Sequence, residues 1–235
     1  MKKILLAAAL LLGGYASAFA DAASLVFNTS RSDIPAIELS DKAAEGECNV
    51  RGGLPHAMNL IRNGKPVTVA FLGGSITQGG FCYRLQLAKW LEKRYPNVKF
   101  TWINAGVPGT GTDLGVFRVD EQVLSANPDL VFIEFSANGG YTPAMEGIIR
   151  KIHAHNPDTD ICLLYSATEP HMRAYQKGEM ADVVKGEEAL ADHYGLPSIH
   201  MARRAAALES EGKLIWKGPK DAPADKIVFS ADGLH

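Results

Sequence analysis

The stretch from Thr68 to Gly80, Thr-Val-Ala-Phe-Leu-Gly-Gly-Ser-Ile-Thr-Gln-Gly-Gly, constrains the fold more than any other part of the chain. Its apolar run is typical of a strand buried on both faces, and the glycines after it indicate a tight turn into a helix. Such a turn lies at the carboxyl edge of a parallel sheet, where open α/β proteins bind their ligands. Ser75 in this turn is therefore a candidate nucleophile, although a serine in a turn usually just caps a helix.

Other glycine-rich turns are excluded by their motifs. A phosphate-binding P-loop needs a lysine after its last glycine, whereas Phe81 follows Gly80. The stretch also lacks the G-x-G-x-x-G pattern of dinucleotide-binding folds. Thr77 stands where the G-x-S-x-G turn of α/β-hydrolases has its second glycine.

Strands and helices alternate after this region. Strands are expected at residues 67–72, 98–104, 129–135, 160–165 and 197–200, and helices at 81–95, 114–125, 143–155, 181–194 and 202–209. The alternation predicts right-handed crossovers and a three-layer α/β/α fold with a mostly parallel five-stranded sheet. Residues 65–235 would form this domain. Residues 21–64 would form an N-terminal extension packed on it, with short strands suggested at 24–27 and 36–39 and a short helix near 55–62.

Residues 1–20 have the pattern of a secretory signal peptide. Two lysines precede an apolar run at residues 4–12, and Ala18-Phe19-Ala20 forms an A-x-A cleavage site. The apolar run is too short to span a bilayer. Cleavage after Ala20 is expected to give an exported protein, periplasmic or extracellular, whose mature chain has no membrane span.

The net charge and the cysteines limit the kinds of partner and of covalent or metal site that the chain can have. The chain has 24 Lys and Arg against 26 Asp and Glu, which gives no support for a nucleic-acid partner. Cys162 lies in an apolar run and is expected to be a buried thiol, whereas Cys48 and Cys82 either form a disulfide or stay free. The spacing of the cysteines does not suggest a zinc site. The sequence predicts no metal and no cofactor, and leaves the oligomeric state open.

Two more predicted strands end in groups that suit an oxyanion hole. The second leads into Asn104-Ala-Gly-Val-Pro-Gly109 and the third into Ser136-Ala-Asn138. Acyl transfer needs hydrogen-bond donors aimed at the developing oxyanion, and a glycine N–H and an asparagine amide are both suitable. Taken alone, Gly109 is a plain turn residue and Asn138 a loop cap.

The chain closes with Ser230-Ala-Asp232-Gly-Leu-His235. One loop can bring Asp232 and His235 together. His235 would then take the Ser75 proton while Asp232 orients the imidazole. A polar chain end is the simpler explanation for this motif by itself.

Together, four segments resemble the sequence blocks of the SGNH hydrolases, also called the GDSL esterase/lipase family. They are Gly73-Gly-Ser-Ile-Thr77, Asn104-Ala-Gly-Val-Pro-Gly109, Glu134-Phe-Ser-Ala-Asn138 and Asp232-Gly-Leu-His235. Two positions depart from the pattern, because Gly74 replaces the usual Asp of the first block and Gly139 the Asp that often follows the third. The flanking Arg51-Gly-Gly-Leu-Pro55 resembles a bacterial branch often associated with polysaccharide deacetylation.

The resemblance implies a flavodoxin-like SGNH hydrolase fold and a site made of family residues. Ser75, Asp232 and His235 would be the catalytic triad, and Ser75, Gly109 and Asn138 the oxyanion hole. Family members usually continue past the histidine with a closing helix, so the domain is expected to lack that helix.

The substrate side of the site is less constrained. His171, after the fourth predicted strand, and Arg118 are candidates to contact substrate, although a solvated loop histidine and an exposed helix arginine are alternatives. The resemblance and the leader together predict an exported serine esterase acting on O-acetyl groups of a carbohydrate. The alternatives are a lipase or thioesterase of the same family, or an inactive carbohydrate-binding module.

Overall fold

The computed structural model describes residues 21–30, 45–80, 83–140, 142–218 and 227–230. The predicted leader and the strand suggested at 36–39 lie outside these ranges. The elements, in chain order, are η1 (Ala22–Leu25), β1 (Val26–Phe27), β2 (Cys48–Asn49), α2 (Pro55–Arg62), β3 (Val67–Gly73), α3 (Ser75–Gln78), α4 (Tyr83–Arg94), β4 (Phe100–Gly106), α5 (Thr112–Gln122), η2 (Leu124–Ala126), β5 (Leu130–Glu134), η3 (Ser136–Asn138), α6 (Thr142–His155), β6 (Asp160–Tyr165), α7 (Glu169–Gln176), α8 (Asp182–Tyr194), β7 (Ser198–His200), α9 (Met201–Ser210), β8 (Leu214–Lys217) and β9 (Ile227–Ser230).

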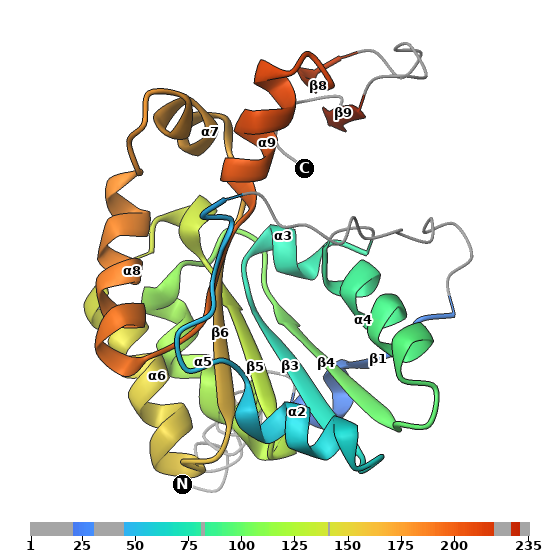
Figure 1. Ribbon diagram of the computed structural model, residues 1–235. Helices are drawn as coiled ribbons and strands as arrows, with labels where there is room; N and C mark the ends of the chain where they lie inside the picture. The colour runs from blue at the N-terminus through green and yellow to red at the C-terminus, as the bar shows by residue number, and fades with distance from the viewer. Residues whose placement is uncertain (1–20, 31–44, 81–82, 141, 219–226, 231–235) are drawn as a thin grey trace, which may run out of the picture.

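The main sheet has the strand order β1-β4-β3-β5-β6-β7-β2 (Figure 1). Its five central strands are parallel and match the five predicted ones, so the predicted α/β fold is confirmed. Their order is that of flavodoxin-like folds. The two outer strands, β1 and β2, run antiparallel to their neighbours and bring the sheet to seven strands rather than five. Each is only two residues long, too short to give a clear alternation in the sequence.

Helices cover both faces of the sheet. Alternate side chains along each strand point to opposite faces, so Ala70 and Leu72 enter one core and Val69 and Phe71 the other. The first core also contains residues of α5, α6 and α8, and the second contains residues of α2 and α4. This is the predicted three-layer arrangement.

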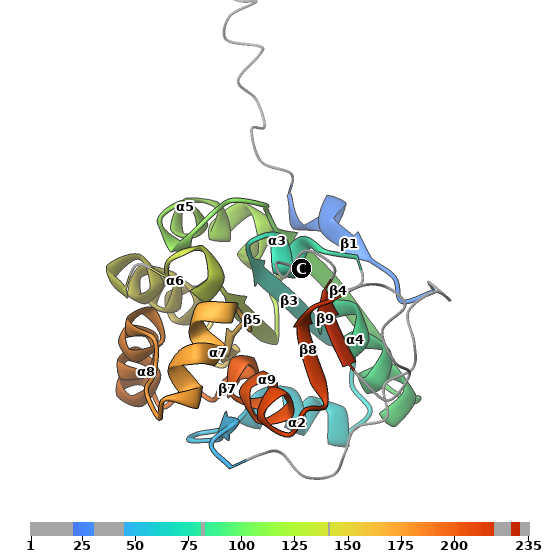
Figure 2. The same cartoon turned by 90° about the horizontal axis from the view of Figure 1, so that it is seen from above.

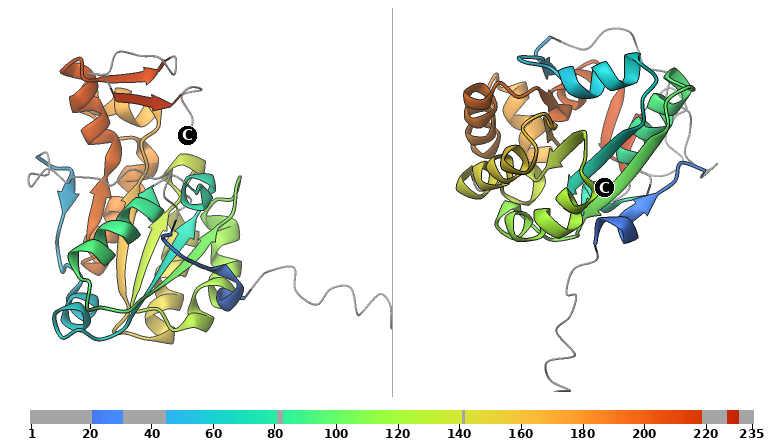
Figure 3. Two further views of the ribbon diagram at one scale, coloured as in Figure 1. Left: turned by 90° about the vertical axis from the view of Figure 1, so that its right-hand side faces the viewer. Right: turned by 90° about the horizontal axis from the view of Figure 1, so that it is seen from below.

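A smaller apolar cluster lies above the carboxyl end of the sheet. It joins α7, α9 and β8 through Met172, Ala202, Ala205, Leu214 and Trp216. Strands β8 and β9 pair in a separate two-stranded sheet, set apart from the main one (Figure 3). Helix α7 occupies what the sequence suggested was a loop; the Thr168 side chain caps it by accepting from the backbone N–H of His171.

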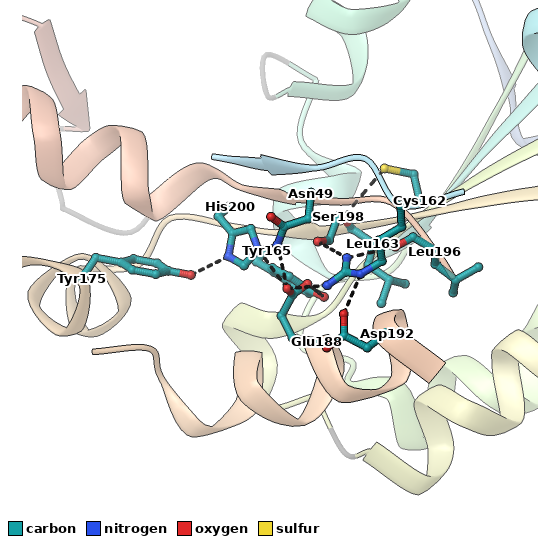
Figure 4. A network of polar contacts seen from close by, with 11 residues as sticks. Asn49, Cys162, Leu163, Tyr165, Tyr175, Glu188, Asp192, Leu196, Ser198 and His200 are labelled. Carbon is teal, nitrogen blue, oxygen red and sulfur yellow. Dashed lines mark hydrogen bonds and ion pairs between the residues drawn. The ribbon is translucent and has the colours of Figure 1, made fainter. Parts of the chain in front are cut away.

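A polar network attaches the segment around β2 to the neighbouring strand β7 and to α8 (Figure 4). Arg51 donates to Glu188 at 2.7 Å, to Asp192 at 2.8 Å and to the Ser198 hydroxyl at 2.8 Å. Glu188 also accepts from the Tyr165 hydroxyl at 2.9 Å. The Arg-Gly-Gly motif noted in the sequence therefore has a structural role in the described residues: its arginine ties the segment after β2 to α8 and β7.

His200 lies at one end of this network. Its Nδ1 is 2.6 Å from the Tyr175 hydroxyl, and its Nε2 is 3.2 Å from the Asn49 amide nitrogen. The same Nε2 also lies 3.5 Å from a carboxylate oxygen of Glu188. His200 is thus held in the core between β2 and α7.

The Glu188 carboxylate is expected to make stability fall in acid. Burial by itself would raise the pKa of Glu188, but hydrogen bonds from His200, Arg51, Ser198 and Tyr165 hold it well below its usual range. A depressed folded-state pKa stabilises the fold fully above the unfolded pKa of about 4.5, and this contribution is lost as the pH falls from there through the lower folded-state pKa. We expect Glu188→Gln to cost about 3 kcal/mol at pH 7 and less near pH 3, where part of the contribution is already lost. Thermal unfolding against pH measures this, with the exposed Glu121→Gln as control; equal losses at both pH values would contradict it.

The cysteines partly follow expectation. Cys162 is buried in β6, as predicted. Cys48 is exposed and carries a free thiol, which leaves the disulfide alternative without support. Cys82 lies outside the described residues.

Candidate active site

Three strands end at the same level of the sheet. Gly73, the last residue of β3, pairs with Gly106 at the end of β4 and with Glu134 at the end of β5. The turns that follow these strands therefore meet at one edge, the upper end of the sheet in Figure 1 and the near side in Figure 2. This is the edge at which the sequence placed the candidate residues.

Glycines let helix α3 sit directly on the strand ends. A Cβ on Gly73 would lie 2.1 Å from the Thr77 hydroxyl oxygen, and one on Gly106 would lie 2.3 Å from the Gln78 backbone nitrogen. A Cβ on Gly74 would lie 2.3 Å from the Asn138 amide nitrogen. The contacts at Gly73 and Gly106 include backbone atoms and leave no room for a side chain, whereas the contact at Gly74 is with the end of the Asn138 side chain. Ser75, the first residue of α3, follows directly.

The second and third turns converge beside this serine. The Asn138 amide nitrogen donates to the Thr110 carbonyl at 3.0 Å, which links the turn after β5 to the turn after β4. Gly109, immediately before Thr110, has a φ of 71°, a conformation that favours glycine. The structure thus brings Ser75, Gly109 and Asn138 to one place. Asp232 and His235 lie outside the described residues.

Arg118 has a different position from the one expected. Only 1% of it is exposed, so it does not face a substrate cleft. Its guanidinium donates to the carbonyls of Ala105 at 2.8 Å and Gly73 at 2.9 Å, and to the Thr110 hydroxyl at 3.0 Å. Burial lowers the pKa of Arg118 to about 10, which leaves the group charged at neutral pH. Arg118 therefore holds the ends of β3 and β4 and the Thr110 turn together, and the idea that it contacts substrate is corrected.

His171 is also more enclosed than either sequence alternative suggested. It lies on α7 and is 7% exposed, with its Nδ1 3.2 Å from the carbonyl oxygen of Ser166. A carbonyl only accepts, so Nδ1 carries a proton. Burial lowers the pKa of His171 and favours the neutral ring. A solvated loop histidine is thus excluded.

Sequence reasoning missed two charged residues near the nucleophile turn. Arg84 on α4 donates to the carbonyl of Thr77 at 2.9 Å and to those of Gln78 and Gly79 at 3.4 and 3.3 Å, which satisfies the carboxyl end of α3. Glu134 ends β5 and is 1% exposed. The sequence signal that could have found Glu134 is a carboxylate directly after four apolar residues of one strand. A charge at such a buried position is costly unless it has hydrogen-bond partners.

A further buried carboxyl lies close to the turn after β5. Glu187 of α8 is 1% exposed, and a Cβ on Gly140 would lie 1.9 Å from its Oε1. Burial, with smaller contributions from the charges of Glu134 and Glu188, raises the pKa of Glu187 to about 8. The carboxyl is therefore mostly protonated at neutral pH.

The described part of the chain has neither a candidate metal cluster nor a candidate membrane span. No cluster of three or more His, Cys, Asp and Glu residues there is arranged to hold a metal ion. Within the same ranges, no helix is both long and apolar enough to cross a bilayer.

The fold and the converging turns are those of the SGNH-type hydrolases. The family model described as "GDSL-like Lipase/Acylhydrolase family" matches residues 71–225. The chain belongs to this family, and the predicted resemblance is confirmed. No curated protein sequence matches the chain significantly.

Solved structures agree with this assignment. A two-domain esterase active on acetylated mannans is 31% identical, with a TM-score of 0.58 over 68% of this chain and 43% of that chain. The same esterase crystallised with mannopentaose is 30% identical, with a TM-score of 0.60 over 74% and 47% of the two chains. The present chain thus spans less than half the length of these relatives. A mutant of Axe2, an acetylxylan esterase from Geobacillus stearothermophilus, is 17% identical with a TM-score of 0.51 over 72% and 89%, and supports the fold alone.

Proposed function

We propose that the chain is a serine esterase that removes O-acetyl groups from a carbohydrate. The observation that carries the proposal is the meeting of the three turns: Asn138 lies against Gly74, directly before Ser75, and is hydrogen-bonded to the residue after Gly109. A nucleophile between two oxyanion donors at the carboxyl edge of a parallel sheet suits acyl transfer.

The mechanism assigns each residue a step. The Ser75 oxygen attacks the ester carbonyl while His235 accepts its proton and Asp232 orients the imidazole. The oxyanion receives hydrogen bonds from the backbone N–H groups of Ser75 and Gly109 and from Asn138. The Asn138 amide has two hydrogens, so the one donated to Thr110 fixes the group and the other serves the oxyanion. His235 returns the proton to the leaving alcohol, and water then cleaves the acyl-enzyme.

Two lines of support favour an acetylated carbohydrate in an exported setting. The relatives at 30% and 31% identity are described as active on acetylated mannans. The leader pattern of residues 1–20 suits export, with a mature protein that begins at Asp21. A polysaccharide outside the cytoplasm is a substrate that only an exported enzyme reaches.

The experiment produces the full chain in a bacterial host and separates cytoplasm from periplasm. Protein recovered outside the cytoplasm should have the mass of a chain that begins at Asp21. It should hydrolyse p-nitrophenyl acetate much faster than p-nitrophenyl palmitate and should release acetate from acetylated mannan or xylan. Faster cleavage of the palmitate ester would favour the lipase alternative. No turnover of any ester would favour an inactive carbohydrate-binding module and overturn the proposal.

A further inference from the structure

The Glu134 carboxylate is the centre of a buried hydrogen-bond network under the candidate site. Its Oε2 accepts from the Thr77 hydroxyl at 3.0 Å, and its Oε1 accepts from the Ser166 hydroxyl at 2.8 Å. The backbone N–H groups of Thr77 and Ala137 also face the carboxylate and favour its charged form. All of these groups are donors, and they come from three separate segments of the chain.

The hydroxyl groups of this network are all oriented toward the carboxylate. Thr77 spends its one hydroxyl proton on Glu134, so the Tyr83 hydroxyl, 3.0 Å away, must donate to Thr77. Ser166 likewise donates to Glu134, so the Ser136 hydroxyl, 3.2 Å away, must donate to Ser166. Ser136 in turn accepts from the backbone N–H of Ser166 at 3.0 Å. This single direction fits an ionised Glu134 that only accepts.

The network links the two halves of the candidate site. Thr77 belongs to α3, whose first residue is Ser75, and Ser136 belongs to η3, whose last residue is Asn138. Glu134 connects them through Thr77 on one side and through Ser166 on the other. Glu134 therefore lies between the turn that begins α3 and the turn that ends in Asn138.

A carboxylate at this position is not required by the fold. The four preceding residues of β5 are apolar and buried, and an apolar residue would continue the core. Burial raises the pKa of Glu134, so the charge opposes stability until its donors compensate for it. Glu134 is a buried charge that accepts hydrogen bonds from the turn of Ser75 and from the turn of Asn138. This arrangement indicates that it holds the two turns in place.

We infer that Glu134 is a positioning residue that holds the nucleophile helix and the oxyanion turn at their working distance. The inference rests on the proposed function and adds to it a residue that does not touch the substrate. We call this hydrogen-bonded link the bridge. One arm is Thr77, which joins Glu134 to α3, and the other is Ser166, which joins Glu134 to η3 through Ser136.

The kinetic test compares variants that break or keep the bridge. Glu134→Gln keeps the shape of the side chain but turns one accepting oxygen into a donor, and we expect kcat for p-nitrophenyl acetate to fall about 10²-fold with KM little changed. Thr77→Val removes one arm and should lower kcat about 10-fold, whereas Thr77→Ser keeps the hydroxyl and should stay close to wild type. The double variant of Glu134→Gln and Thr77→Val should be little worse than Glu134→Gln alone. Multiplied losses in the double variant would show that the two residues act separately and would overturn the bridge.

Hydrogen exchange gives a readout that does not require activity. The amides of Gln78 and Gly79 donate to Gly74 and Ser75, and that of Asn138 donates to Phe135, so all three report on the linked turns. We expect Glu134→Gln to speed exchange in both turns together. Thr77→Val removes one of the two hydrogen bonds and should speed exchange in both turns to a smaller extent. It takes the place of Glu134→Gln in this test if that variant does not fold.

Asp160→Asn is the matched control. Asp160 is a buried carboxyl at the opposite end of the neighbouring strand β6, where it accepts from the backbone N–H of Ala57 at 2.8 Å. Its loss should loosen α2 and leave both active-site turns unchanged. Unchanged exchange in Glu134→Gln, or a change in one turn only, would overturn the inference while leaving the esterase proposal intact. An inactive wild-type protein would defeat the proposed function, and the exchange result would still decide the role of Glu134.

Discussion

Replacement of Ser75 by alanine is expected to lower kcat for p-nitrophenyl acetate about 10⁴-fold or more. Without the hydroxyl no acyl-enzyme forms, and only the weaker acceleration from the oxyanion donors remains. The fold should be unaffected, because Ser75 is only half buried at the start of α3 and alanine is tolerated at a helix start where no side-chain cap is needed. Steady-state kinetics and thermal unfolding of the same sample give the two readings.

Ser125→Ala is the control for this variant. Ser125 is exposed, and its hydroxyl donates to the backbone carbonyl of Glu121, away from the three converging turns. It should keep the wild-type rate. A serine-directed fluorophosphonate should add one adduct to the wild-type protein and to Ser125→Ala, and none to Ser75→Ala. A Ser75→Ala protein with near wild-type rate would end the serine-esterase proposal.

The order of elements could be predicted because most of them are long and strongly patterned. The apolar run before Gly73 predicted β3, and the helix expected near residues 55–62 is α2, which begins at Pro55 where a proline suits the first turn. The two-residue strands β1 and β2 are defined by their partners in the sheet rather than by their own sequence. The segment of α7 was expected to be a loop after the fourth strand, although Thr168 and Pro170 form a recognisable helix start.

The sequence could predict the candidate site only at residues whose type suits catalysis and which directly follow a predicted strand. Glycine, serine and asparagine directly after buried strands indicated the turns that meet around Ser75. The roles of Arg118 and Glu134 depend on which backbone atoms face them, and these are set by the register of β3 with β4 and β5. A charged residue on a predicted helix or at a strand end looks the same in sequence whether it contacts solvent, substrate or the backbone of another strand.

Replacement of Asn138 by alanine is expected to lower kcat about 10²- to 10³-fold with little change in KM. The amide would act on the oxyanion, which exists only in the transition state and intermediate, so ground-state binding of the ester should be nearly unaffected. The variant also removes the bond to Thr110, whose carbonyl accepts at 3.0 Å, and a stability loss of about 1–2 kcal/mol should accompany the kinetic effect. Kinetics and unfolding must therefore be measured on the same preparation.

Two comparisons separate an oxyanion donor from a residue that only braces the turn. A boronic acid that forms a tetrahedral adduct with Ser75 should bind the Asn138→Ala protein more weakly by a factor similar to the loss in kcat, because it carries the same oxyanion. Asn63→Ala removes an exposed amide at the end of α2 that donates to the Asn59 carbonyl, and it should change neither quantity. If Asn138→Ala instead raised KM and left boronate affinity unchanged, Asn138 would be a substrate-binding residue, and the oxyanion would depend on backbone donors such as those of Ser75 and Gly109.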